Sequence, residues 1–99
     1  MEIDIRGRGE GKTHDLIKLS AERNMTIVVC NRNRRNALLH QARHMGVRIP
    51  LPLTVQELHG LRGLRQKIGK VLVDDLEDVL YSALGVPVNK ATMTGVKQI

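Results

Sequence analysis

Hydrophobic residues in this chain of 99 amino acids follow two different spacings, one typical of strands and one typical of helices. Apolar and polar residues alternate over residues 2–6, which is the pattern of a strand with one buried face. The apolar runs within residues 25–30 and 70–75 have the length and β-branched content of strands buried on both faces. Residues 88–96 predict a last strand, interrupted by polar positions.

Between the predicted strands, apolar residues recur at helical spacing and stop at residues that commonly end helices. Thr54 and Glu57 match a capping box, in which each side chain caps the backbone of the other at the start of a helix. The predicted helices are Lys12–Arg23, a helix after the turn Asn31–Asn33 that ends at Gly46, a short helix from Val55 to about His59, and a helix after Asp75 that Gly85 and Pro87 close.

This alternation of strands and helices predicts an α/β domain, with a mainly parallel four-stranded sheet flanked by helices. Residues 47–52 contribute a brief extended piece, and residues 60–69 form a basic, glycine-containing loop. Ligands of parallel sheets bind at the carboxyl ends of the strands. We therefore expect four segments to gather at that edge: residues 7–13, the residues after Cys30, Asp74–Asp75 and Thr92–Gly95.

A glycine-rich turn joins the first predicted strand to the first predicted helix. Its sequence over residues 6–13, Arg-Gly-Arg-Gly-Glu-Gly-Lys-Thr, resembles the phosphate-binding pattern G-x-x-x-x-G-K-[ST], but Arg6 replaces the first glycine. Glycines let several backbone N–H groups face one anion, and the positive end of the following helix faces the same point. The alternative is a basic surface turn without a ligand. The predicted nucleotide-binding residues are Gly7, Arg8, Gly9, Glu10, Gly11, Lys12 and Thr13.

A pair of carboxylates ends the strand predicted within residues 70–75. A carboxylate at this position is suited to hold the Mg²⁺ ion that bridges nucleotide phosphates, and we assign that role to Asp74, with the Thr13 hydroxyl as a second ligand. Asp75 is then placed to orient or deprotonate a water molecule, while Lys12 contacts the outer phosphates. The alternative is that one aspartate caps the following helix.

With the two motifs in this order, the chain resembles the P-loop NTPases over nearly its whole length. The resemblance is closest to the branch of superfamily 1 and 2 helicases, RecA-like proteins, terminase ATPases and thymidine kinases, and extends to small P-loop proteins of bacteriophages. It implies a single truncated P-loop domain over residues 1–99. It also implies the sheet order 25–30, 70–75, 88–96, 2–6, and a phosphate-sensing role for Thr94, with Thr92 as second choice. Threonine is also common in strands, so the simpler interpretation is that Thr94 is an ordinary strand residue without a role in sensing phosphate.

Composition limits the classes of partner. The net charge of +6 and the pI of about 10.1 favour polyanions, namely nucleotides, nucleic acid or an acidic protein surface, although charged groups usually just face water. A single aromatic residue, Tyr81, argues against a platform that stacks nucleic-acid bases.

The lone Cys30, the lack of a signal-peptide core and the lack of a bilayer-length apolar segment predict a cytoplasmic protein without a membrane partner. His40 and His44 at helical spacing are a weak zinc candidate.

The sequence therefore predicts a basic protein that binds ATP or GTP with Mg²⁺ and hydrolyses it slowly, if at all. Efficient hydrolysis would need an arginine from a partner or from a second copy of the chain. The main alternative is a non-enzymatic accessory that binds nucleic acid or protein on a degenerate P-loop scaffold. A nucleoside or nucleotide kinase is a third hypothesis, for which no acceptor site is evident.

Overall fold

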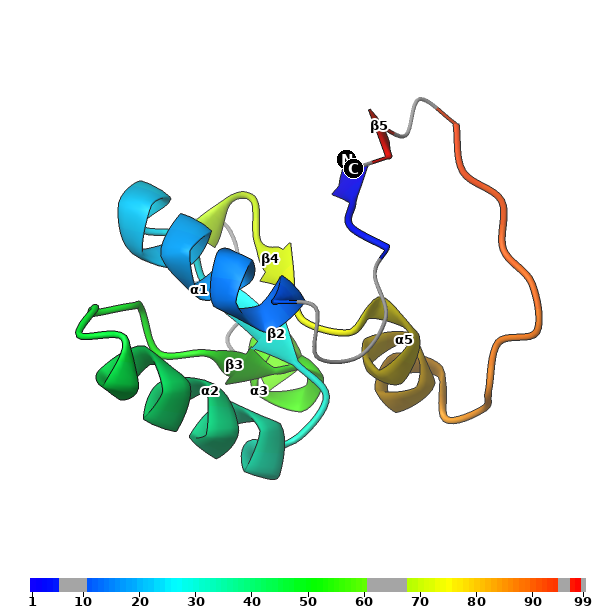
Figure 1. Cartoon of the computed structure of the whole chain (residues 1–99). Helices are drawn as coiled ribbons and strands as arrows, with labels where there is room; N and C mark the ends of the chain where they lie inside the picture. Colours follow the sequence, from blue (N-terminus) through cyan, green and yellow to red (C-terminus); the bar gives the residue numbers. More distant parts are fainter. Residues whose placement is uncertain (6–10, 61–67, 95–96, 99) are drawn as a thin grey trace.

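The computed structural model describes residues 1–5, 11–60, 68–94 and 97–98, and these form an α/β fold (Figure 1). A three-stranded, all-parallel sheet is accompanied by four helices in this part of the chain. The strands are β1 (Glu2–Ile3), β2 (Ile27–Val29), β3 (Leu53–Thr54), β4 (Leu72–Val73) and β5 (Lys97–Gln98), and the helices are α1 (Lys12–Arg23), α2 (Arg32–His44), α3 (Val55–Gly60) and α5 (Leu76–Leu84).

The main sheet has the order β3-β2-β4, with β2 in the centre, so the predicted four-stranded sheet is wrong: among the described residues this sheet has three strands, and β1 pairs with β5 instead. Val28 of β2 is paired with Leu53 of β3 on one side and with Val73 of β4 on the other. All three residues of β2 are buried, which confirms the prediction of a strand covered on both faces. The predicted strands at 25–30 and 70–75 are therefore neighbours, although each is shorter than its apolar run.

Helices cover both faces of this sheet and produce three layers. Ile27 and Val29 point to one face and pack with Ile17 of α1 and Leu38 of α2. Val28 points to the opposite face and packs with residues of α3 and α5. Because successive side chains of a strand alternate between faces, three residues of β2 supply apolar contacts to two separate clusters. Both clusters are entirely aliphatic, as the composition predicts.

The helix ends follow local signals in the sequence. Helix α1 has the predicted bounds and ends at Asn24, which adopts the left-handed conformation. Thr54 and Glu57 form the predicted capping box, in which the Glu57 carboxylate accepts from the Thr54 N–H at 2.9 Å and the Thr54 hydroxyl accepts from the Glu57 N–H at 3.1 Å. Gly85 closes α5 with φ of 78°, a conformation that favours glycine.

Helix α2 begins earlier than predicted. The turn expected at Asn31–Asn33 is wrong, because the Asn31 side chain accepts a hydrogen bond from the Arg34 N–H at 2.8 Å and caps a helix that starts at Arg32. Asparagine favours both turns and helix N-caps, so the residue type alone does not separate these outcomes.

The last predicted strand is also wrong over most of its length. Residues 88–94 contain no strand, and all of them except the half-buried Val88 are exposed. Without burial on either face, polar residues in this segment keep water as their hydrogen-bonding partner. The chain instead forms β5, which pairs in parallel with β1 through Glu2 and Lys97, apart from the main sheet (Figure 1).

None of the helices in the described part of the chain is both long enough and apolar enough to cross a lipid bilayer. The longest, α2, has 13 residues and carries four arginines. A bilayer-spanning helix needs about 20 predominantly apolar residues.

Replacement of Leu38 by alanine tests the two-sided core. Leu38 is fully buried in the cluster beneath α1 and α2, so Leu38→Ala should lower the free energy of unfolding by about 2–5 kcal/mol. Leu84→Ala is the matched control, since Leu84 is also helical but 60% exposed, and should change it by less than about 0.5 kcal/mol. Urea denaturation of the three proteins measures both values. Equal effects of the two substitutions would contradict the assignment of the core.

Candidate functional site

The first turn of α1 opens toward the carboxyl edge of the sheet. Gly11 precedes the helix with φ of 84°, and its carbonyl accepts the first helical hydrogen bond, from the Asp15 N–H at 3.0 Å. No side-chain hydrogen bond caps this helix end among the described residues, and the positive end of the helix dipole lies here. Lys12 and Thr13 are the first two residues of α1 and lie at this point.

A concavity of about 320 Å³ lies beside this helix end. It is lined by Gly11, Lys12, Thr13, His14 and Gln41. The lining combines the Gly-Lys-Thr sequence with a residue of α2, so two elements of the same sheet face enclose it. Asp74 is not among the residues that line it.

Asp74 follows β4 directly and is only 6% exposed. Its backbone N–H donates to the Val28 carbonyl at 3.1 Å, which continues the ladder between β4 and β2 by one residue. The same parallel arrangement places Asn31, soon after the end of β2, at this edge. The cap of α2 then fixes the backbone of Arg34 beside Asp74.

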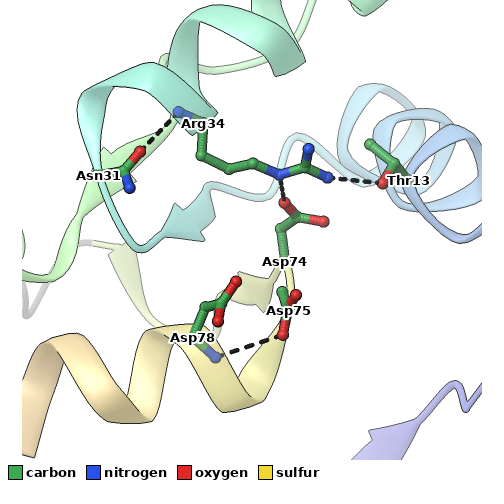
Figure 2. A network of polar contacts seen from close by, with 6 residues as sticks. All are labelled: Thr13, Asn31, Arg34, Asp74, Asp75 and Asp78. Carbon is green, nitrogen blue, oxygen red and sulfur yellow. Dashed lines mark hydrogen bonds and ion pairs between the residues drawn. The ribbon is translucent and has the colours of Figure 1, made fainter. Parts of the chain in front are cut away.

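The Arg34 side chain joins the two residues that the sequence assigns to a metal ion (Figure 2). Its Nε donates to Asp74 Oδ2 at 2.5 Å, and its Nη2 donates to Thr13 Oγ1 at 3.0 Å. One guanidinium therefore contacts oxygens from the start of α1 and from the end of β4. The predicted proximity of the Gly-Lys-Thr turn and the strand-end aspartate is realised through this contact.

Burial is unequal across the ion pair. The Asp74 side chain is 7% exposed and the Arg34 side chain is 39% exposed, so the guanidinium covers the carboxylate from the solvent side. The hydrogen bond to Asp74 is the main reason why the pKa of Arg34 is raised, and partial burial acts in the opposite direction. A negative charge this deeply buried requires a positive partner, and Arg34 provides it.

Asp75 points in a different direction from Asp74 (Figure 2). Its side chain accepts from the Asp78 N–H at 3.4 Å and caps α5, so the capping alternative is confirmed for this residue. The backbone of Asp75 has φ of 59°, a conformation that costs a non-glycine residue about 1–3 kcal/mol. The nearby Asp75 charge is the largest cause of a raised pKa at Asp78.

The other predicted residues have different outcomes. Gly7, Arg8, Gly9 and Glu10 lie outside the described residues. Thr94 is exposed, in a segment that runs away from the main sheet, so the structure does not bring it to Asp74 (Figure 1).

Two other sets of side chains could in principle bind a metal ion or act as a nucleophile: the histidines of α2 and the Cys30 thiol. His40 and His44 share one face of α2, with ring centroids 4.6 Å apart, and both are exposed. The described residues hold no group of three or more His, Cys, Asp or Glu side chains that could bind a metal ion. Burial, followed by the Asp78 charge, raises the pKa of the Cys30 thiol, which makes it a poor nucleophile.

The donors at the carboxyl edge fit Mg²⁺. Thr13 and Asp74 offer a hydroxyl and a carboxylate, which are hard oxygen ligands. Magnesium is commonly bound through one or two carboxylates together with water and substrate phosphates, rather than by a complete set of protein ligands. Thr13 Oγ1 and Asp74 Oδ2 both contact the positively charged Arg34 side chain, so they lie close enough to a single cation to suit that mode of binding.

Arg32, Arg34 and Arg35 are among the residues after Cys30 that were expected at this edge. In the structure Arg34 pairs with Asp74, Arg35 pairs with Glu57, and Arg32 is exposed. A signal was present, because three arginines and no acidic residue occupy the first turn of α2, where the helix dipole disfavours cations. Such residues need carboxylate partners from other elements, and Asp74 and Glu57 are those partners.

Comparisons with protein families, with curated proteins and with solved structures find no match to this chain. A functional assignment must therefore come from the geometry of the site. That geometry comprises the first turn of α1, the buried carboxylate after β4 and the arginine that connects them.

A double-mutant cycle tests this connection. Arg34→Ala, Asp74→Ala and the double variant should show a coupling energy of about 1–3 kcal/mol in urea denaturation, between the values for exposed and buried ion pairs. The control cycle combines Asp74→Ala with Arg32→Ala, which removes an exposed arginine of the same helical turn and should show coupling below about 0.5 kcal/mol. Similar coupling in the two cycles would show that Arg34 has no specific contact with Asp74.

Proposed function

We propose that this chain is a small P-loop protein that binds a nucleoside triphosphate, ATP in the first instance, together with Mg²⁺. The observation that carries this assignment is the convergence of Thr13 and Asp74 on one cationic group at the carboxyl edge of a parallel sheet. Thr13 follows a Gly-Lys pair at a helix start, and Asp74 follows β4, whose two residues are half-buried rather than buried on both faces as predicted. These are the two positions that a magnesium-nucleotide site requires on such a sheet.

Each residue has a role that follows from its position. Gly11 and the first N–H groups of α1 face the phosphates, and Lys12 adds a mobile positive charge to them. Thr13 and Asp74 hold the metal ion through oxygen atoms. When bound, Mg²⁺ neutralises charge on the outer phosphates and fixes their orientation.

The strand pairs support the finer fold of the P-loop NTPases. That fold implies the order 25–30, 70–75, 88–96, 2–6, and one of its neighbour relations is present as β2 beside β4, whereas β1 pairs with β5 in a separate sheet. The last strand is displaced to Lys97–Gln98. We propose that the β1–β5 pair adds to the free edge of β4 when nucleotide is bound.

Hydrolysis of the bound nucleotide would depend on Asp75. Asp75 is exposed and next to the metal-binding position, so it is the residue that would orient a water molecule. A carboxylate accepts several hydrogen bonds at once, so the cap on α5 and a bound water are compatible. We expect slow turnover by the chain alone, because stabilisation of the transferring phosphate would need an arginine from a partner or a second copy.

A non-enzymatic, polyanion-binding accessory is the second candidate. Helix α2 carries four arginines and no acidic residue, and Arg32, Arg43 and both of its histidines are exposed. The replacement of the first loop glycine by Arg6 also favours this alternative. Nucleic acid or an acidic protein surface would be the partner, and its binding would weaken steeply with salt.

Calorimetric titration with ATP and Mg²⁺ tests the nucleotide assignment. Lys12→Ala should weaken ATP binding by about 10- to 100-fold, the usual effect of losing a charge-assisted hydrogen bond. Lys18→Ala is the matched control, since Lys18 is an exposed lysine further along α1, and should bind like the unaltered protein. Equal, negligible binding by all three proteins would exclude the nucleotide function and favour the accessory role.

Asp75→Asn serves as the companion variant for hydrolysis. Asparagine is as good an N-cap as aspartate, so α5 should remain intact and ATP binding should be retained. Phosphate release should fall to background if Asp75 orients the water. Release at the rate of the unaltered protein would mean that Asp75 is only a helix cap.

A further inference from the structure

On the basis of the nucleotide site proposed above, we propose that Arg34 is an internal competitor for the metal ion. In the ligand-free chain its guanidinium occupies the oxygen atoms of Thr13 and Asp74 that Mg²⁺ would use (Figure 2). The metal ion and the Arg34–Asp74 pair then exclude one another. Binding of the metal requires release of Arg34.

Competition follows from the atoms involved. Asp74 Oδ2 accepts from Arg34 Nε at 2.5 Å, and Thr13 Oγ1 accepts from Arg34 Nη2 at 3.0 Å. A divalent cation on these oxygens would approach the carboxylate and the hydroxyl that the guanidinium contacts, although both groups keep lone pairs beyond those that Arg34 uses. It would also place a second positive charge in contact with the guanidinium, where partial burial strengthens the repulsion between them.

Differences in mobility make Arg34 the group that leaves. Asp74 is buried, and its backbone is tied to β2 through the Val28 carbonyl. The backbone of Arg34 is fixed by the Asn31 cap, but its side chain is 39% exposed and long enough to swing into solvent. The ligand oxygens can therefore stay in place while the arginine is displaced.

The neighbouring Arg35 shows what a purely structural pair looks like in this fold. Its side chain is 15% exposed and pairs with Glu57, which already belongs to the capping box of α3. That pair joins α2 to the start of α3, and among the described side-chain contacts of Arg35 it is the one that is shown. Arg34 instead connects a hydroxyl and a carboxylate on two separate elements, both at the ligand edge.

Release of Arg34 would make metal binding depend on nucleotide. A metal ion alone has to separate the Arg34–Asp74 pair without giving the guanidinium another anion. A nucleotide that arrives with the metal brings phosphate oxygens, with which the released arginine can pair bidentately. The resident arginine thereby suppresses binding of free divalent cations and favours the metal-nucleotide complex.

Affinity for Mn²⁺ without nucleotide, measured by electron paramagnetic resonance, tests this competition. Arg34→Gln should bind Mn²⁺ about tenfold more tightly than the unaltered protein, a change of about 1.4 kcal/mol. Arg32→Gln removes the same charge from an exposed position in the same turn and should change the affinity by less than about twofold. A double variant with both Arg34→Gln and Asp74→Asn should lose the increase in Mn²⁺ affinity.

The outcomes separate this inference from the nucleotide function. If the unaltered protein binds Mg-ATP but Arg34→Gln binds Mn²⁺ no more tightly, Arg34 is not a competitor and the nucleotide function stands. If Arg34→Gln gains Mn²⁺ affinity and none of the proteins binds ATP, the competition is supported and the nucleotide function fails. Absence of both Mn²⁺ and ATP binding in every protein overturns both.

A second measurement uses the unaltered chain, so it does not require that the Arg34→Gln variant folds. In nuclear magnetic resonance spectra, the Arg34 Nε–H proton should exchange slowly with water, because it donates to a buried carboxylate. Saturation with Mg²⁺ and ATP should move this signal and accelerate its exchange. A signal that keeps its position and its slow exchange at saturation would show that Arg34 stays on Asp74.

Discussion

Burial of β2 on both faces is the constraint on which the rest of the structure depends. Its three residues, Ile27, Val28 and Val29, are at most 3% exposed and supply apolar contacts to the clusters on both sides of the sheet. The chain has no Phe or Trp, so this central aliphatic strand provides the common surface on which four helices pack in the described part of the chain. Loss of that packing would remove the framework of the site as well as of the fold.

The same strand positions the candidate chemistry. Pairing with β4 carries Asp74 to the carboxyl edge, where its N–H donates to the Val28 carbonyl. Soon after β2 ends, Asn31 caps α2 and directs Arg34 toward Asp74 and Thr13. A buried carboxylate, a hydroxyl at a helix start and a partly exposed arginine thus meet through the geometry of a parallel sheet. This meeting of three groups is the observation on which the proposed metal-nucleotide site rests.

Features that depend on neighbouring residues were predictable from the sequence, and features that depend on distant partners were not. The bounds of α1, the Thr54–Glu57 capping box and the Gly85 stop are local, and all three were predicted. The capping role of Asp75 was predicted only as an alternative, because the same residue type suits a cap and a catalytic site. The strand expected within residues 88–96 did not form over residues 88–94, since β-propensity has little effect without a sheet to bury the side chains. The bridge from Arg34 to Asp74 depends on strand register, which no local pattern encodes.

Placement of the metal ion tests the central claim most directly. Mn²⁺ added with ATP in substoichiometric amounts broadens amide signals of the ¹⁵N-labelled protein according to their distance from the metal. We predict that the signals of Thr13 and Asp74 disappear first, followed by those of their neighbours at the carboxyl edge. First loss of the His40 and His44 signals, with those of Thr13 and Asp74 intact, would place the metal on the exposed histidine pair of α2 and contradict the account.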